Sequence, residues 1–285
     1  MSVEEIALAI ACNAEPLIGI VHLPAQPARR GVLAVVAGGP QYRAGCCRQL
    51  VYMARALSAQ GIPVMRFDYR GMGDSAGDFL GFQHVEDDLA AALDAFTRTV
   101  PGLSEVVLWG GCDAASAILI NAHRYPIVTG LILGNPYAHS EETRAAVERH
   151  YYLARLRDKA FWAKLLKLKF NPLPAMRSLW KAFVPKVNGK ENSAHASARS
   201  TAFTERMLSG LKRYRGKILL IMSGQSLTSQ EFDELVVRIP AWRKAVDEAD
   251  IERVDIPHAD QAFSTIEARE SMITAAQQWL AQWPK

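Results

Sequence analysis

The sequence lacks the features that would send a chain into or across a membrane. No stretch of its 285 residues approaches the roughly 18 consecutive apolar positions of a spanning helix. Glu4 and Glu5 stand where a secretory signal would carry Lys or Arg. We therefore expect a cytoplasmic protein, in which a reducing environment keeps the four cysteines as thiols.

Metal-binding and nucleic-acid-binding patterns are also missing. The cysteines have no CxxC spacing and no accompanying histidine cluster, which argues against a zinc site. The sequence implies neither a metal nor an organic cofactor. Basic and aromatic residues do not combine into a recognisable nucleic-acid module, so we expect no nucleic-acid partner.

The net charge of +4 is unevenly distributed. Residues 137–204 contain 13 Lys and Arg but only 5 Asp and Glu, whereas the rest of the chain has a small excess of acidic residues. Such a change in composition predicts that residues 137–204 form a separate structural unit.

Outside that segment, strand-like and helix-like runs alternate along the chain. This alternation predicts an α/β fold with a mostly parallel, eight-stranded sheet and helices on both faces. The expected strands are 4–12, 17–23, 32–36, 63–68, 106–109, 127–133, 218–222 and 251–256. Helices are expected after residue 50 and at 84–98, 113–123 and 265–282.

The most informative motif joins the fifth expected strand to the next helix. It reads Gly110-Gly111-Cys112-Asp113-Ala114 and fits the G-x-nucleophile-x-G elbow of α/β-hydrolases, with small residues two before and two after Cys112. A helix N-terminus would favour the thiolate of Cys112. The alternative is that Cys112 is only a small buried apolar residue.

An elbow of this kind also predicts an oxyanion hole. The backbone N–H of Asp113 would donate one hydrogen bond, and the loop near Gly39, after the third strand, would donate the other. The run Asp68-Tyr69-Arg70-Gly71-Met72-Gly73-Asp74-Ser75 fits the sharp turn after the fourth strand of this fold, and we expect it to be structural.

These motifs together resemble the exosortase A system-associated hydrolase 1 family of the α/β-hydrolase superfamily. The resemblance covers nearly the whole chain and is carried by 38–43, 67–75, 109–116, 135–136, 150–152 and 231–232. It implies a cysteine nucleophile and a link to bacterial systems for sorting PEP-CTERM proteins and making exopolysaccharide. It does not supply a substrate.

The sequence departs from this family at two expected triad positions. Ser226 stands where similar proteins carry the acidic residue, and Gln261 stands where they carry the histidine base. An amide cannot take a proton from a thiol, and a hydroxyl cannot stabilise an imidazolium as a carboxylate does. The triad is therefore expected to be degenerate.

A nearby histidine could replace the missing base. His258 lies three residues before Gln261, and a shifted loop could bring it to Cys112, with Glu231 or Asp260 as its orienting acid. The alternative is that His258 is an exposed loop residue. His84 is a more remote candidate, and we expect it to be a solvated group at the start of a helix.

The basic segment predicts three parts in the chain. Residues 1–136 and 205–285 would form the α/β-hydrolase core, and 137–204 would form an inserted helical cap. The cap could pack an apolar face on the core, with its lysines in water. It could instead cover an acyl or isoprenoid-like substrate and make peripheral contact with a membrane surface.

Two functions follow from these residues. In the first, the chain is a hydrolase or acyltransferase for ester or thioester substrates: a small-molecule acyl group is transferred to Cys112 and released slowly. In the second, the chain is an inactive hydrolase-fold protein that binds a ligand or a partner.

Overall fold

The computed structural model describes residues 3–36, 41–138 and 190–283; for 190–201 it describes the backbone alone. Its chain divides into two compact units, one formed by Met1–Ala138 with Thr204–Lys285 and the other by His139–Phe203. Most of the predicted cap therefore lies outside the described residues. The predicted cap and its two interpretations stay predictions.

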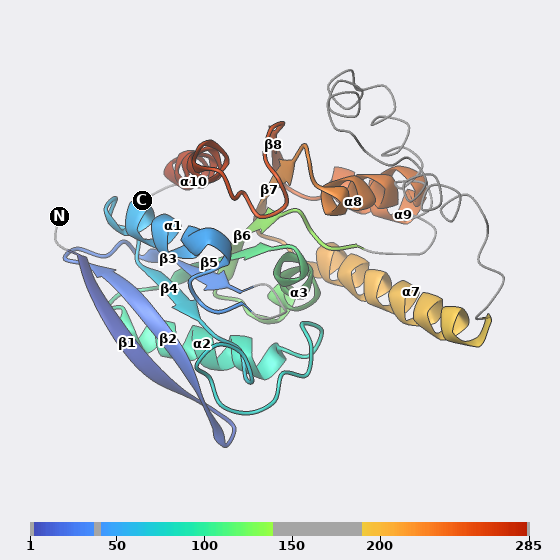
Figure 1. Cartoon of the computed structure of the whole chain (residues 1–285). Coiled ribbons are helices and arrows are strands. Elements are labelled where there is room, and N and C mark those ends of the chain that lie inside the picture. The colour runs from blue at the N-terminus through green and yellow to red at the C-terminus, as the bar shows by residue number, and fades with distance from the viewer. Residues whose placement is uncertain (1–2, 37–40, 139–189, 284–285) are drawn as a thin grey trace, which may run out of the picture. The chain divides into compact units, whose positions relative to one another are not determined.

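The larger unit is built on one eight-stranded sheet (Figure 1). Its strand order is β1-β2-β4-β3-β5-β6-β7-β8, and only the pairs β1–β2 and β2–β4 are antiparallel. The strands are β1 (Val3–Cys12), β2 (Glu15–Pro24), β3 (Arg30–Val35), β4 (Val64–Phe67), β5 (Glu105–Gly111), β6 (Val128–Gly134), β7 (Lys217–Ser223) and β8 (Ile251–Ile256). The predicted α/β class and mostly parallel sheet are confirmed.

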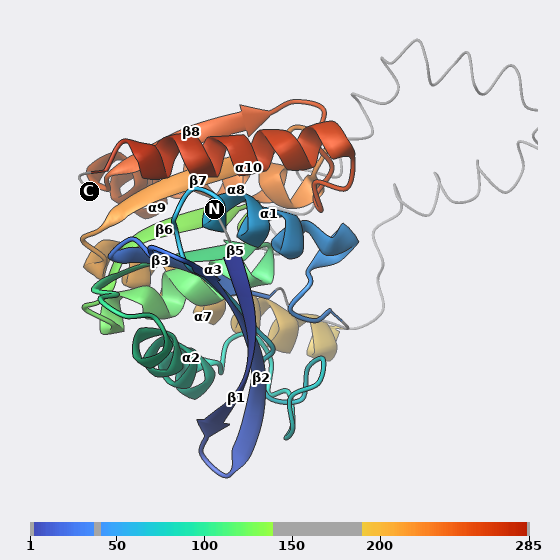
Figure 2. The same ribbon diagram turned by 90° about the vertical axis from the view of Figure 1, so that its left-hand side faces the viewer.

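Helices cover both faces of this sheet (Figures 1 and 2). Helices α1 (Gln49–Ser58) and α10 (Ile266–Ala281) contact each other on one face, and α2 (Glu86–Thr99) and α3 (Asp113–Asn121) lie on the other. The remaining helices are α7 (Lys190–Arg213), α8 (Leu227–Arg238), α9 (Pro240–Glu248) and the short η1 (Cys46–Arg48) and η2 (Ala122–Arg124).

The sequence pattern found the strands more accurately than the helices of the last third. Each strand lies within two residues of its predicted range. Helices α8 and α9 were not predicted, because short amphipathic segments between β7 and β8 give a weak periodic signal. Ser226 caps α8 and Pro240 begins α9, so helix-start signals were present in both places.

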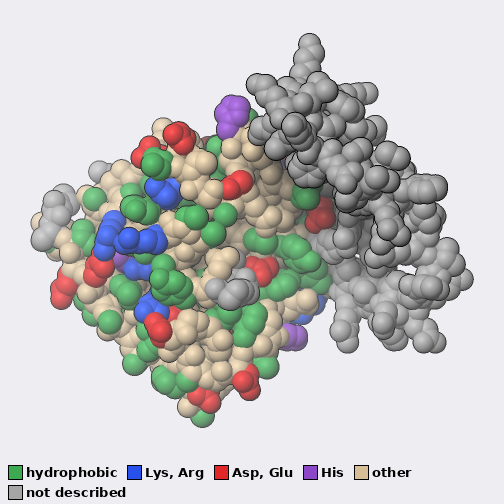
Figure 3. Space-filling model, in the orientation of Figure 1, with side chains coloured by type: hydrophobic (Ala, Val, Ile, Leu, Met, Phe, Trp, Pro, Cys, Tyr) green, Lys and Arg blue, Asp and Glu red, His purple; other side chains and the backbone are tan. Residues whose placement is uncertain are grey.

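The core lies between the sheet and its two helical layers. The central strands β3 and β5 are almost wholly buried, as parallel strands covered on both faces should be. At the surface, basic side chains gather beside acidic ones on the side of β1 and α1 (Figure 3), and the ion pair of Arg55 with Glu5 joins these two elements at 2.8 Å. Among the described helices, none has the length and apolar character needed to cross a bilayer.

Candidate active site

Cys112 lies in a strained turn between β5 and α3. Its φ of 53° and ψ of −124° place it in a region that L-residues rarely adopt. Three backbone hydrogen bonds hold it there: the Cys112 N–H donates to the Gly134 carbonyl at 2.8 Å, and the Cys112 carbonyl accepts from the N–H groups of Tyr137 and Ser116 at 3.2 and 3.3 Å. This is the geometry of a nucleophile elbow, in which the turn presents the side chain at the carboxyl end of the sheet.

Gly110 shows why the elbow needs a residue without a side chain. A Cβ at this position would lie 2.6 Å from Ile118 Cδ1 and 2.9 Å from the backbone carbon of Ala114. Helix α3 therefore packs directly on the end of β5. The small residues around Cys112, which the sequence pattern singled out, follow from this close approach.

Gln261, which stands at the position predicted for the base, contacts Cys112 directly. Its Nε2 donates a hydrogen bond to Cys112 Sγ at 3.0 Å, and its Oε1 accepts one from Thr228 Oγ1 at 2.9 Å. The chain Thr228–Gln261–Cys112 thus follows the order of a triad, but neither Thr228 nor Gln261 can exchange a proton with the thiol near neutral pH. Turning the amide over would exchange the two bonds without creating a base, because neither amide atom takes up a proton near neutral pH.

Ser226 has a different role from the one expected for the acid position. It is 1% exposed, and its side-chain oxygen accepts a hydrogen bond from Ser229 N–H at 3.3 Å, which caps the first turn of α8. The residue that contacts Gln261 is Thr228, two positions later. Sequence reasoning missed Thr228 because its position depends on where α8 begins.

His258 is not among the described residues that line the pocket around Cys112, and its side chain is exposed. His84 is also exposed and lies in the loop before α2. Asp260, considered as an orienting acid, instead accepts hydrogen bonds from the backbone N–H groups of Ala262 and Ser264 at 3.2 and 2.9 Å. The loop that carries Gln261 is therefore held by Asp260, and the structure gives no support to a displaced base.

Asn135 is a second residue that sequence reasoning missed. It is fully buried, and its Nδ2 donates to Ser223 Oγ at 2.8 Å and to the Gln261 carbonyl at 3.0 Å. Its Oδ1 accepts from Ser223 N–H at 2.8 Å and from Ser229 Oγ at 2.6 Å. One amide thus joins the ends of β6 and β7, the start of α8 and the Gln261 loop, which makes Asn135 a positioning residue.

The loop that follows β3 is held by the turn after β4. Asp68 is fully buried and pairs with the Arg43 guanidinium at 2.5 Å, and it also accepts from the backbone N–H groups of Arg43 and Asp74. A Cβ on Gly73 would lie 2.4 Å from Asp68 Oδ2, so glycine is required there. The turn is structural, as expected, and it anchors one wall of the pocket at Cys112.

Of the two predicted oxyanion donors, only Asp113 belongs to the described residues. Asp113 is the first residue of α3, and its backbone N–H hydrogen-bonds the Cys112 thiol. Gly39 lies in 37–40, outside the described residues. The oxyanion hole formed by Asp113 and Gly39 therefore stays a prediction.

The environment of Cys112 favours the neutral thiol. Burial, together with the nearby Asp113 and Glu231 carboxylates, raises the pKa of Cys112 to about 11, although hydrogen bonds from the Asp113 N–H and from Gln261 act to lower it. The expectation of a thiolate stabilised by the helix N-terminus is thus wrong, because desolvation of the charged form outweighs these donors.

A raised pKa predicts how fast Cys112 is alkylated at different pH values. Because only the thiolate reacts, the iodoacetamide rate at Cys112 should rise about tenfold per pH unit and should still be rising at pH 10. Glutathione, whose thiol has an ordinary pKa, should level off above about pH 9. Peptide mapping after timed labelling measures the Cys112 rate separately from those of the other cysteines. A plateau near pH 9 for Cys112 would contradict the raised pKa.

Cys112 opens into a small pocket of about 300 Å³. Asp113 is its one charged residue among the described lining residues, and neither Lys nor Arg is among them. The described lining residues are Gln41, Gly45, Cys46, Gln49, Leu50, Trp109, Gly111, Cys112, Asp113, Gln261, Ala262 and Phe263. No group of three or more His, Cys, Asp or Glu within the described ranges is arranged to hold a metal.

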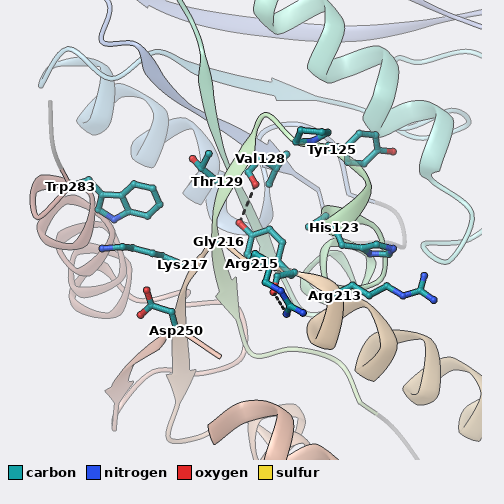
Figure 4. A pocket seen from close by; sticks show the side chains of 13 residues that line it. His123, Tyr125, Val128, Thr129, Arg213, Arg215, Gly216, Lys217, Asp250 and Trp283 are labelled. Carbon is teal, nitrogen blue, oxygen red and sulfur yellow. Dashed lines mark hydrogen bonds between the residues drawn. The ribbon is translucent and has the colours of Figure 1, made fainter. Parts of the chain in front are cut away.

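A larger cavity, of about 530 Å³, lies at the opposite edge of the sheet (Figure 4). It is bordered by the amino ends of β6 and β7 and contains Arg213, Arg215 and Lys217. No cysteine is among its described lining residues. Since nucleophile elbows lie at the carboxyl ends of the strands, the smaller pocket at Cys112 is the candidate active site.

Comparison with known families agrees with this geometry. Residues 28–231 match the model of the family described as serine aminopeptidase, S33. The chain belongs to this family. It is therefore a member of the α/β-hydrolase superfamily, and Cys112 lies in the turn between its β5 and α3.

Solved structures show the same fold at low sequence identity. Est1E from Butyrivibrio proteoclasticus, solved with ferulic acid, has a TM-score of 0.61 and 17% identity, over 97% of this chain and 99% of that one. The Pyrococcus furiosus esterase Pf2001 has a TM-score of 0.64 and 14% identity, over 99% and 91%. Dienelactone hydrolase from Anabaena variabilis has a TM-score of 0.60 and 15% identity, over 100% of both chains. No curated protein matches the sequence.

Proposed function

We propose that this S33-family protein acts on an ester or thioester through Cys112, and that the acyl group is released slowly. The observation that carries the proposal is the hydrogen bond from Gln261 Nε2 to Cys112 Sγ at 3.0 Å. It supports the proposal because an amide, and not a basic side chain, lies within hydrogen-bond distance of the Cys112 thiol in the elbow. The fold and the elbow support acyl chemistry, and the amide argues against rapid turnover.

The proposed acylation step does not need a basic side chain of the protein. The sulfur forms a bond to the acyl carbon, the bond from that carbon to the leaving group breaks, and the thiol proton passes to water. A leaving group such as nitrophenolate departs without needing a proton. Deacylation is harder, because water must be deprotonated as it attacks and Gln261 cannot accept that proton.

A second candidate function is binding of an acyl ligand or a partner without chemistry. The raised pKa of Cys112, about 11, favours it, since little thiolate is present near neutral pH.

The sequence motifs support two further parts of the proposal. These are a cytoplasmic location and an association with exosortase and exopolysaccharide systems. The basic composition of 137–204 supports a peripheral membrane contact.

Intact-mass measurement during exposure to p-nitrophenyl acetate tests the proposal. We expect one acyl group per chain and a burst of about one nitrophenol per chain, followed by release at least about a hundredfold slower than the burst. Cys112→Ala should abolish both signals. Cys46→Ser, which changes a thiol in the same pocket, should leave the adduct in place, and so should His258→Ala.

Continuous release that depends on His258 would contradict the proposal and indicate a rebuilt triad. Failure of several esters to acylate Cys112 would favour binding without chemistry.

A further inference from the structure

Cys46 and Cys47 are neighbouring thiols whose sulfur atoms lie 4.0 Å apart. Contact between adjacent side chains needs a turn, since successive side chains of an extended chain point to opposite sides. That turn is present, because the φ angles of Gly45, Cys47 and Arg48 are 71°, 51° and 58°, values that residues other than glycine rarely adopt. The turned backbone thus brings the two sulfur atoms together.

The turn is packed against the start of α1. A Cβ on Gly45 would lie 2.6 Å from Leu50 Cγ and 3.1 Å from Gln49 Cγ, so the loop and the helix are in close contact. The Gly45 N–H donates to the Tyr42 carbonyl at 2.8 Å, and the Leu50 N–H donates to the Ala44 carbonyl at 3.1 Å. The contact between the two thiols therefore follows from a turn that is held on both sides.

The two thiols differ in their access to solvent. Cys47 is exposed, whereas Cys46 is half-buried and lines the pocket at Cys112. Burial, together with the neighbouring Cys47, raises the pKa of the Cys46 thiol. Cys12 is buried, and the pKa of Cys112 is raised to about 11. Cys47 is therefore the thiol that is most open to a reagent in water.

We propose that Cys46 and Cys47 form a redox-sensitive dithiol, which a low-molecular-weight disulfide of the glutathione type oxidises to a disulfide between the two neighbours. The Cys47 thiolate attacks one sulfur of the small disulfide, which forms a mixed disulfide and releases one small thiol. The Cys46 thiolate then attacks the Cys47 sulfur, and the second small thiol leaves. The protein pair loses two electrons and two protons, which the two released thiols carry.

A disulfide between these neighbours should be strained and easily reduced. Its Cα atoms would be about 3.8 Å apart across a trans peptide bond, whereas most disulfides join Cα atoms that are about 4.4–6.8 Å apart. Strained or exposed disulfides are the ones that small thiols reduce readily. The pair should therefore return to two thiols when reduced glutathione is in excess.

The experiment exposes the whole chain to oxidised glutathione. After timed exposure the remaining thiols are blocked with N-ethylmaleimide, and the protein is digested with trypsin without reduction. Trypsin releases residues 44–48 as one peptide, which contains Cys46 and Cys47 and no other cysteine. We expect this peptide to lose two hydrogen atoms without retaining glutathione, and to recover them in excess reduced glutathione.

Variants separate the roles of the two thiols. Cys46→Ser removes the thiol that expels the mixed disulfide, so glutathione should accumulate on Cys47. Cys47→Ser removes the exposed thiol and should slow modification of the peptide 44–48 at least about tenfold. Cys112→Ala is the control, because it removes another thiol from the same pocket, and it should keep the loss of two hydrogen atoms.

Three results would overturn the inference. Glutathione that stays on Cys47 in the unchanged protein would show that Cys46 does not expel it. A disulfide between Cys46 and Cys112 would assign the exchange to a different pair. An unmodified peptide 44–48 after prolonged exposure would show that Cys47 does not react. None of these results involves acylation of Cys112, so the proposed function stands or falls separately.

Discussion

Gln261→His is expected to turn the slow release of the acyl group into continuous turnover, with a steady-state rate about 10²–10⁴ times higher than that of the unchanged protein. The position already lies within hydrogen-bond reach of the nucleophile, since Gln261 Nε2 is 3.0 Å from Cys112 Sγ. An imidazole there can take the thiol proton, protonate a leaving group and activate water for deacylation. The amide can do none of these.

A second change should add to the first. Thr228 holds the far side of Gln261 through its hydroxyl at 2.9 Å, so Thr228→Asp in the Gln261→His background would place a carboxylate beside the new ring. That carboxylate would orient the imidazole and stabilise its protonated form. Thr228→Asp alone should give no turnover, because the site would still lack a base.

Steady-state release of nitrophenol from p-nitrophenyl acetate measures the effect. Gln261→Leu is the matched control, since it also removes the amide but adds no titratable group. The rate of Gln261→His should rise with pH through about 6.5, the ordinary pKa of histidine, while that of Gln261→Leu should not. If the two variants turn over at the same rate, the assignment of position 261 to the base is wrong.

Gly210→Ala is expected to lower the free energy of unfolding by about 3 kcal/mol or more. Gly210 lies in α7, where the helix crosses the end of α3, and a Cβ there would lie 1.9 Å from the Leu119 carbonyl oxygen. Backbone cannot yield as a side chain can, so α7 and α3 would have to separate. This loss outweighs the roughly 1 kcal/mol that alanine usually contributes over glycine within a helix.

Urea unfolding followed by circular dichroism measures this change. Ser209→Ala makes an alanine substitution at the neighbouring, exposed position of α7 and should change stability by no more than about 0.5 kcal/mol. A Gly210→Ala protein as stable as Ser209→Ala would show that the two helices do not approach as closely as the structure indicates.

The fold could be read from the sequence because its signals are local. Buried parallel strands such as β3 and β5 are short apolar runs, and an elbow needs Gly110 and Ala114 on either side of its nucleophile. These patterns depend on neighbouring residues alone. They therefore placed Cys112 correctly at the junction of β5 and α3, and they singled out Gln261, which hydrogen-bonds the Cys112 thiol.

The partners of Gln261 could not be read in this way. Thr228 and Asn135 lie 33 and 126 positions from Gln261 in the chain, and they meet it because β6 and β7 end, and α8 begins, at the same edge of the sheet. Ser226 was chosen for the acid position by its place after β7, but the start of α8 makes it a helix cap. A shift of two residues in a helix start is enough to exchange these roles.

The sequence by itself thus determined the fold class, the place of Cys112 at the strand–helix junction and the absence of a histidine at position 261. Tertiary structure alone decided the protonation of Cys112, because its pKa depends on burial and on carboxylates that folding brings near it. It also decided which residues line the pocket at Cys112, among them Gln49 of α1 and Trp109 of β5. Local patterns encode backbone conformation, whereas electrostatics and recognition depend on distances between residues that are far apart in the chain.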